Sequence, residues 1–336
     1  MKIRSLLLAL LLLLIVAGLW LAQDVRRALH QPLVLAQPQA FEIEDGEAFA
    51  ATLRRLRTQG LLDTDRAVFY LRVYVRVQNI GSKIRSGEYE LKPGLNALDL
   101  LALFMSGQTL LHELRITEGM TAAQALQLIA AEPNLHHTLS SADPAAAMAA
   151  LGEPGLPAEG RLFPDTYRFP RHTPDLTLLR QARAMMQNVL AAEWAQRAPE
   201  LPYASADEAL VMASIVEKET GAAAERPQIA GVFVRRLRLG MLLQTDPTVI
   251  YGLGARFDGN LRLADLRADT PYNTYTRKGL PPTPICLPGR AAIHAALHPD
   301  DGKALFFVAR SDGTHAFSES LEQHNAAVRQ FQLKKP

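Results

Sequence analysis

Cysteine is almost absent from this chain, which has 336 residues and one cysteine, Cys286. A single cysteine excludes an intramolecular disulfide and a cysteine-rich zinc site. We therefore expect a packed core to stabilise the protein, with Cys286 as a packing residue. Hydrophobic residues make up 48% of the sequence, which is enough for a sizeable core and argues against disorder.

An excess of charge of one sign is also missing. The 36 basic and 34 acidic side chains leave a net charge of +2, and a nucleic-acid-binding protein normally has a concentrated basic surface. We therefore expect no nucleic acid as a partner. The local cluster of Arg235, Arg236 and Arg238 is predicted to be a solvated helix face. The phosphate-binding motifs GxGxxG and GK(S/T) do not occur, which argues against a nucleotide-handling protein.

Charged residues are absent from an apolar run near the N-terminus, residues 6–22. These seventeen residues, at a helical rise of 1.5 Å, span roughly 26 Å, close to the ~30 Å of a bilayer core. Trp20 stands where an interfacial aromatic residue is expected. We predict a transmembrane anchor at residues 5–23, after a cytoplasmic tip at residues 1–4. A cleaved signal peptide is the alternative, but Trp20 disfavours a cut after Ala22, since cleavage sites need small residues.

Basic residues on both sides of the anchor bear on its orientation. Lys2 and Arg4 favour a cytoplasmic N-terminus, whereas Arg26 and Arg27 favour the opposite. We predict a single-pass protein of the cytoplasmic (inner) membrane, with its N-terminus inside and the rest of the chain in the periplasm.

Beyond the anchor, the sequence predicts an α+β protein in two parts. Residues 24–111 are expected to form a linker and a small α+β module, and residues 112–336 a larger mixed α+β domain. Helices are expected where apolar residues recur at helical spacing, and strands where they alternate. The expected elements are a lead-in without regular structure at 31–45, helices at 46–60, 66–77, 96–105, about 120–160 and 174–197, strands at 86–91 and 111–117, and a strand-like turn at 163–167.

A capping box at residues 205–208 fixes the start of another helix. The Ser205 side chain can accept from the Glu208 amide, and Glu208 can reach back. The helix is predicted to run from Ala206 to Thr220 and to stop at Gly221.

Two glutamates near the end of this helix point in nearly opposite directions. At 100° per residue, Glu219 falls within the apolar arc of the helix, and Glu217 falls on a narrower, mixed face. They therefore cannot form a close catalytic pair. A carboxylate in an apolar arc must be paired, neutral or lining a cleft, and desolvation raises its pKa, as a general acid requires. The alternatives are that Glu219 is exposed at a frayed helix end and that Glu217 is solvated or ion-paired.

Polar residues in two later segments are candidates for binding a substrate. Gln244, Thr245 and Asp246 precede Pro247 at a predicted helix start, where Asp246 is either an N-cap or a substrate contact. The second segment offers amide and phenol groups and flat ring faces, or is simply a polar loop; it comprises Tyr272, Asn273, Thr274 and Tyr275. His315, His324 and Asn325 are candidates for structural hydrogen bonds. We predict no metal site and no cofactor, because no acidic or cysteine partner stands at ligand spacing from these histidines.

Several long motifs, in one order, resemble a known family. They are FPDTYRF (163–169), ASIVEKET (213–220), LQTDPTVIYGLG (243–254), PYNTYTRKGLPPTPICLPG (271–289), AALHPD (295–300), LFFVAR (305–310) and HAFSESLEQHN (315–325). From about residue 112 to the C-terminus the chain resembles the YceG-like family of endolytic murein transglycosylases. A weaker match, around residues 86–107, resembles a LysM-like module.

The resemblance implies a lyase that cuts peptidoglycan glycan strands. Such enzymes cleave the β-1,4 bond between N-acetylmuramic acid and N-acetylglucosamine without water and leave a 1,6-anhydro sugar. The second glutamate of the family's ExE motif maps to Glu219, as general acid and base. Glu217, the two polar segments and Asn325 are then expected around the substrate. An enzyme tethered to the membrane meets nascent strands at a raised effective concentration, so we expect its cuts to limit their length. Contact with penicillin-binding-protein synthases is implied by the resemblance alone.

Two other functions stay open at this point. A glycoside hydrolase would pair Glu219 with a second carboxylate, Asp165 or Asp246, and would give reducing-end products. A non-catalytic, membrane-tethered scaffold of the cell-wall synthesis machinery would instead bind glycan through the LysM-like module.

Overall fold

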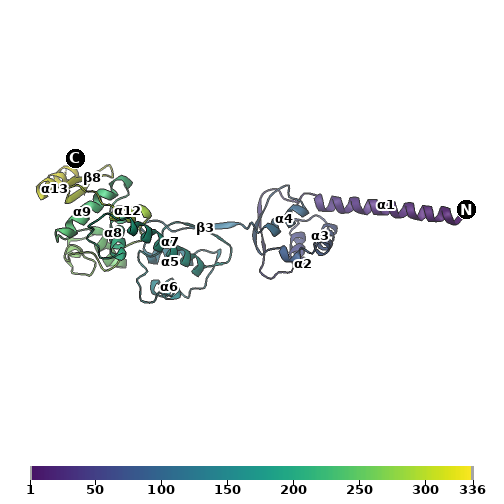
Figure 1. The fold of residues 1–336 in the computed structure, drawn as a ribbon, viewed down its shortest axis with the longest axis horizontal. Coiled ribbons are helices and arrows are strands. Elements are labelled where there is room, and N and C mark those ends of the chain that lie inside the picture. The colour runs from purple at the N-terminus through teal and green to yellow at the C-terminus, as the bar shows by residue number, and fades with distance from the viewer. Residues whose placement is uncertain (1, 334–336) are drawn as a thin grey trace. The chain divides into compact units, whose positions relative to one another are not determined.

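A computed structural model describes residues 2–333 of the chain. Helices and short strands are mixed along the described residues, where the strands pair only in two-stranded sheets (Figure 1). The mixed helix-and-strand class expected from the sequence is confirmed. The chain divides into two compact units, Met1–His112 with Phe169–Arg171 and Glu113–Arg168 with His172–Pro336.

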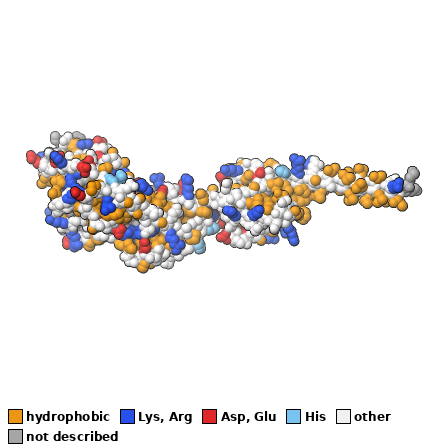
Figure 2. All heavy atoms as spheres, in the orientation of Figure 1, with side chains coloured by type: hydrophobic (Ala, Val, Ile, Leu, Met, Phe, Trp, Pro, Cys, Tyr) orange, Lys and Arg blue, Asp and Glu red, His pale blue; other side chains and the backbone are white. Residues whose placement is uncertain are grey.

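The first unit begins with one long apolar helix, α1 (Lys2–His30). Its apolar side chains between Ile3 and Leu21 are exposed, and Figure 2 shows hydrophobic side chains along the helix. By length and composition, α1 could cross a membrane. Its last turns are folded into the unit, because Asp24 accepts from Tyr70 (2.7 Å) and Arg66 (3.2 Å). Residues 24–30, at the start of the expected linker, are therefore part of this helix.

The rest of the first unit packs around one pair of antiparallel strands. Its elements are β1 (Gln39–Ile43), α2 (Phe49–Thr58), α3 (Asp65–Val77), a 3₁₀ turn (Gly81–Lys83), β2 (Gly87–Leu91) and α4 (Ala97–Ser106). Strands β1 and β2 are antiparallel, with Phe41 opposite Tyr89, and both side chains are buried in the core of the unit. No regular structure was expected at residues 31–45, and β1 shows that this prediction is wrong for residues 39–43. The five residues of β1 are held as a strand by pairing with β2, a long-range contact that local alternation does not reveal.

The second unit has a helical core and short strands, two of which contain residues assigned to the first unit, 111–112 and 169–170. The elements are β3 (Leu111–Arg115), α5 (Ala122–Ala130), β4 (Leu135–His136), α6 (Pro144–Ala150), β5 (Thr166–Pro170), β6 (Thr173–Pro174), α7 (Asp175–Ala195), α8 (Ala206–Glu219), α9 (Arg226–Arg238), α10 (Asp246–Leu253), α11 (Leu263–Arg267), α12 (Arg290–Leu297), β7 (Phe306–Ala309), β8 (His315–Ser318) and α13 (Leu321–Val328), with 3₁₀ turns at Ala223–Glu225 and Gly254–Arg256 and a π turn at Arg329–Leu333. The sheets pair β3 with β5, β4 with β6, and β7 with β8. The alanine-rich stretch, expected to be helical over about 120–160 with a loop around 153–159, is two short helices separated by β4, and residues 153–159 form a loop as expected.

Helix α8 forms the centre of this core. It packs against α7, α9, α10 and α12, and every residue from Ala209 to Val216 is buried. The mixed face that carries Ser214 is therefore buried as well as the apolar arc. Ser214 is satisfied internally: its hydroxyl donates to the Val211 carbonyl (2.7 Å) and accepts from the Ile285 amide (3.0 Å). Cys286 is confirmed as a packing residue, with its thiol directed at the Ser214 carbonyl (3.3 Å).

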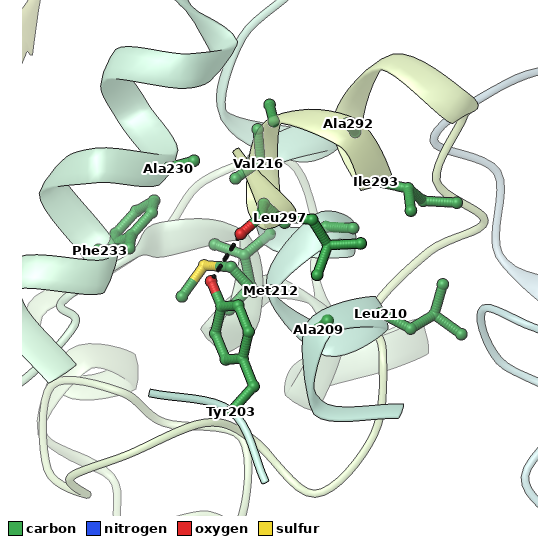
Figure 3. Close-up of a cluster of buried hydrophobic side chains, with 14 of the residues drawn as sticks. Tyr203, Ala209, Leu210, Met212, Val216, Ala230, Phe233, Ala292, Ile293 and Leu297 are labelled. Carbon is green, nitrogen blue, oxygen red and sulfur yellow. Dashed lines mark hydrogen bonds between the residues drawn. The ribbon is translucent and has the colours of Figure 1, made fainter. Parts of the chain in front are cut away.

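Figure 3 shows buried side chains of α8, α9 and α12 packed in one cluster. Tyr203, just before the helix, is buried among Met212 and Leu297, and its hydroxyl donates to the Ala296 carbonyl (3.1 Å). The predicted start of α8 is confirmed, because the Ser205 hydroxyl accepts from the Glu208 amide (3.3 Å). The Glu208 carboxylate reaches back to the Ala204 amide (2.6 Å), one residue beyond the expected partner.

Candidate active site

Glu219 is the last residue of α8 and lies partly buried at its C-terminal end. The hydroxyl of Thr245 donates to its Oε1, and within residues 2–333 this is the one hydrogen bond that its carboxyl receives. The next residue, Thr220, has an extended backbone and ends the helix. Glu219 is therefore fixed in place, and the alternative of an exposed side chain on a frayed helix end is wrong.

The surroundings of Glu219 make its carboxyl group a weaker acid than an ordinary glutamate. Its pKa is raised from the usual 4.5 to about 7, mainly by burial and to a smaller extent by the negative charge of Asp246. The Thr245 hydrogen bond and the positive charges of His315 and Arg236 act in the opposite direction. Desolvation dominates because the charged form loses more hydration than these partners restore. Near neutral pH, the carboxyl group can thus either give or take a proton.

Thr245 is held in position by a second polar segment. Its backbone amide donates to the Thr274 hydroxyl (3.1 Å), and the Gln244 amide donates to the Thr274 carbonyl (3.1 Å). The Thr248 hydroxyl is 2.9 Å from that of Thr274. Gln244 has a positive φ of 51° and is exposed, so the chain turns sharply just before the residue that binds Glu219. The two polar segments predicted from the sequence therefore meet at Thr245 and Thr274.

Asp246 lies beside this junction but does not cap α10. It is the first residue of the helix, and Thr245 is the boundary residue, which corrects the predicted N-cap. The Thr245 hydroxyl is directed at Glu219, so it makes no cap bond. The Asp246 carboxylate is exposed and accepts from the Tyr275 hydroxyl (2.5 Å).

Arg236 is a neighbour of Glu219 that the sequence reading missed. Only 7% of it is exposed, and its guanidinium donates to the carbonyls of Leu305 (2.7 Å) and Leu243 (2.8 Å). The predicted solvated face is therefore wrong for Arg236, which α9 buries against the loop before α10, whereas Arg235 is partly exposed and Arg238 is exposed. The signal was present: Ile229, Phe233 and Arg236 recur at helical spacing, which places the arginine on the apolar stripe.

Two histidines near the C-terminus behave differently from each other. His315 makes the expected structural hydrogen bonds, with its ring Nδ1 2.7 Å from one Glu225 oxygen and its amide donating to the other (2.9 Å). His324 is stacked on Phe306 at 5.3 Å, and its Nδ1 has no hydrogen-bond partner among the described residues. The predicted structural hydrogen bond of the His324 side chain is therefore not formed at Nδ1.

Several predicted residues lie outside the Glu219 cluster. Glu217 pairs with Arg226 (3.2 Å) and accepts from the Gly289 amide (2.9 Å), as in the ion-paired alternative. Asn273 is buried, and its amide donates to the carbonyls of residues 265, 266 and 268, so it shapes the loop. Asn325 is exposed on α13, where its side chain makes no hydrogen bond to the described residues.

Tyr272 and Asp165 also have other neighbours. The Tyr272 hydroxyl is 2.8 Å from that of Thr283, and its ring meets Tyr251 edge-on at 4.9 Å. Asp165 is exposed and accepts from the amide of Thr166 (2.7 Å) in its own loop.

One group in the described part of the chain has the composition of a metal site. The ligand atoms of Glu193, His294 and His298, from α7 and the end of α12, lie within 4.8 Å of one another. The Glu193 carboxylate already pairs with Arg290 (3.2 Å) and with His294 (2.8 Å). These ion pairs account for the group, because a nearby guanidinium opposes a cation at the same carboxylate.

The geometry defines a candidate acid–base site, with the Glu219 carboxyl at the end of a buried helix. Residues 41–330 match the YceG-like family, and the chain belongs to that family. A Bacillus subtilis (strain 168) protein named endolytic murein transglycosylase is 32% identical over 307 residues, which cover 86% of this chain and 83% of that protein.

Further relatives agree with this assignment. Streptococcus pneumoniae proteins of the same name, from strains D39 and R6, are 29% identical over 290 residues. The match covers 76% of this chain, which spans about half (52%) of their length. The crystal structure of a YceG-like protein from Listeria monocytogenes is similar, with 29% identity and a TM-score of 0.54, covering 87% of this chain and 99% of that one.

Proposed function

We propose that this protein is an endolytic murein transglycosylase that cleaves peptidoglycan glycan strands, with Glu219 as its general acid and base. The observation that carries the proposal is the environment of Glu219, whose pKa is raised by burial to about 7 while Thr245 holds its Oε1. A residue that must first give and then take a proton works best with a pKa near the working pH. The names of the relatives support the substrate and the reaction.

In the first step, protonated Glu219 gives its proton to the oxygen of the β-1,4 bond. The bond from that oxygen to C1 of N-acetylmuramic acid breaks, and positive charge develops at C1. The Glu219 carboxylate then takes the proton of the C6 hydroxyl, and the C6 oxygen bonds to C1 to close the 1,6-anhydro ring. Glu219 ends protonated, so no water is consumed and a single carboxyl group suffices.

Neighbours of Glu219 support these two steps in different ways. The Thr245 hydroxyl stabilises the carboxylate that forms after the first transfer, because hydrogen bonding favours the charged form. The Asp246 carboxylate raises the pKa of Glu219 and places negative charge near the developing cation. Tyr275 orients Asp246 through its hydroxyl.

Asp246 also keeps a hydrolase as a second candidate, because it is the carboxylate whose charge acts on Glu219. A hydrolase adds water at C1 and releases a reducing end, and it needs two carboxyl groups at defined spacing. Asp165 is a poorer partner, since it is exposed and bonded to its own loop.

We further propose the division into an anchor at residues 5–23, a linker with a LysM-like glycan-binding module at 24–111 and a catalytic domain at 112–336. The division is supported by the two compact units and by the separate core of the first. An N-terminus inside and a catalytic domain in the periplasm would hold the enzyme near nascent strands, where tethering raises the effective concentration. Penicillin-binding-protein synthases would then be partners, and cutting would limit strand length.

The test is the chemistry of the new chain ends. Full-length protein in detergent is incubated with purified peptidoglycan, and the products are identified by mass spectrometry. We expect 1,6-anhydromuramyl ends, with no oxygen from ¹⁸O-labelled water. Reducing ends labelled with ¹⁸O would favour the hydrolase, and Asp246→Asn would then abolish the labelled product. A folded protein that binds glycan without cutting it would favour the scaffold.

A further inference from the structure

A large cavity lies within the second unit, and the proposed mechanism does not use it. Its volume is about 1280 Å³, at or above the upper end of common ligand pockets. The residues that matter most for its chemistry are Gln124, Gln127, Glu159, Tyr251, Phe257 and Tyr272.

Two residues that line the cavity are direct sequence neighbours of residues in the Glu219 cluster. Lys218 precedes Glu219 and lines the cavity, and Pro247 follows Asp246 and also lines it. One end of α10 therefore contacts Glu219 through Thr245, while Ile250 and Tyr251 further along the helix line the cavity. The cavity therefore begins at residues that directly adjoin the Glu219 cluster.

Glu159 is a buried carboxyl in the wall of the cavity, 8% exposed. It accepts from the Ala122 amide at the start of α5 (2.9 Å) and from the Tyr251 hydroxyl of α10 (3.1 Å). It therefore ties together two helices that line the cavity and fixes the ring of Tyr251. Burial raises the pKa of Glu159 to about 7, a cost that a purely structural link between two donors does not require.

The lining chemistry favours a neutral, amide-bearing ligand with flat apolar faces. Three aromatic rings line the space, Tyr251, Tyr272 and Phe257, and Gln124 and Gln127 offer side-chain amides. Lys218 is the one cation among the lining residues, and its ammonium group already donates to the Gly119 carbonyl (3.3 Å). Acidic stem peptides would need more cationic partners than this. Sugars with acetamido groups, in contrast, can stack on the rings and bond to the amides.

We infer that this cavity is a subsite for the N-acetylated sugars of the glycan strand beside the bond that Glu219 cleaves, with Glu159 as a positioning residue that acts through Tyr251. The inference rests on the proposed function. It adds which part of the substrate is recognised: the sugars and not the stem peptides.

A pair of matched substitutions tests the subsite. Ala123 in the first turn of α5 lines the cavity and is partly exposed, whereas Ala130 at the end of α5 is exposed and does not line it. We expect Ala123→Trp, in full-length protein, to weaken binding of N-acetylglucosamine hexamer about tenfold and to raise KM on peptidoglycan by a similar factor, because the indole fills the cavity. Ala130→Trp should leave both unchanged.

Glu159→Gln tests the positioning role separately. We expect KM on peptidoglycan to rise several-fold with kcat within about twofold. Glu159→Asp should raise KM at least as much as Glu159→Gln does, because the shorter side chain cannot reach Tyr251. A fall in kcat with unchanged KM would assign Glu159 to the chemistry instead.

Three results would overturn the subsite. The first is unchanged hexamer binding in Ala123→Trp, and the second is an unchanged KM on peptidoglycan in the same variant. The third is that free stem tetrapeptide, but not the hexamer, competes with peptidoglycan for the wild-type protein. Each is distinguishable from a failure of the proposed function, because in each the wild-type protein still makes anhydromuramyl ends. A wild-type protein that makes none would remove the function itself.

Discussion

The hydroxyl of Thr245 donates a hydrogen bond to the carboxyl of Glu219, across 26 positions of sequence. The bond joins the end of α8 to the start of α10, and Thr274 fixes Thr245 from the other side (3.1 Å). Because Glu219 must act once as an acid and once as a base, this contact matters twice: it directs the carboxyl group and it limits the rise of the pKa that burial causes.

Thr245→Val removes the donor and keeps the shape of the side chain. The carboxylate form of Glu219 then loses a hydrogen bond, so its pKa rises and Glu219 becomes a weaker acid, which slows the first proton transfer. We expect kcat for anhydro-product formation to fall about tenfold and the alkaline limb of the pH profile to move to higher pH. Thr276→Val, at an exposed threonine of the neighbouring loop, is the control and should keep the wild-type profile.

The pH dependence of activity follows from the raised pKa of Glu219. The reaction starts from the protonated form, so kcat/KM should fall above pH 7, the pKa that burial gives Glu219. The negative charge of Asp246 helps to hold that pKa up. We therefore expect Asp246→Asn to move the alkaline limb to lower pH, as measured from initial rates between about pH 5 and 9. A limb that stays in place would mean that Asp246 does not act on Glu219.

The same carboxyl group links stability to pH. The pKa of Glu219 is about 7 in the folded protein and 4.5 ordinarily, so the folded state binds the proton more tightly. Its contribution is fully present below pH 4.5 and is lost as the pH rises through 7. Glu219→Gln removes this loss and should stabilise the protein at pH 8 by on the order of 3 kcal/mol, with little effect at pH 4.5.

Urea unfolding of the full-length protein in detergent at the two pH values measures this difference. Glu217→Gln is the matched control, since Glu217 pairs with the largely buried Arg226 (3.2 Å). That variant should lose stability at pH 8, because it leaves a guanidinium without its partner. If both substitutions lowered the unfolding free energy at pH 8 equally, ionised Glu219 would not destabilise the folded protein, which would contradict the prediction.

Arg236 should be needed for the fold around Glu219. Arg236→Met keeps the length of the stem but leaves the carbonyls of Leu243 and Leu305 without a donor. We expect a loss of about 2–4 kcal/mol in unfolding free energy. Arg238→Met is the control on the same helix, where the exposed arginine donates to the Glu200 carbonyl (2.8 Å), and should change stability by less than about 1 kcal/mol. Comparable losses in the two variants would contradict the role given to Arg236.

The parts of this structure that were predicted correctly depend on local signals. The cap at Ser205 and the position of Glu219 on the helix follow from residues a few positions apart. The contact between Glu219 and Thr245 could not be predicted, because it depends on how α8 and α10 pack. Strand β1 was missed because its partner β2 begins at Gly87, far along the chain. Arg236 was missed because its charge outweighed its place on an apolar stripe.

The central claim is that Glu219 alone carries the proton transfers. The most direct test is the yield of 1,6-anhydromuramyl ends from peptidoglycan incubated with wild-type protein, Glu219→Gln or Glu217→Gln, each confirmed to be folded. We predict that Glu219→Gln abolishes the product while still binding glycan, and that Glu217→Gln retains it wherever the protein stays folded. Loss of product in folded Glu217→Gln alone, with Glu219→Gln still active, would contradict the assignment.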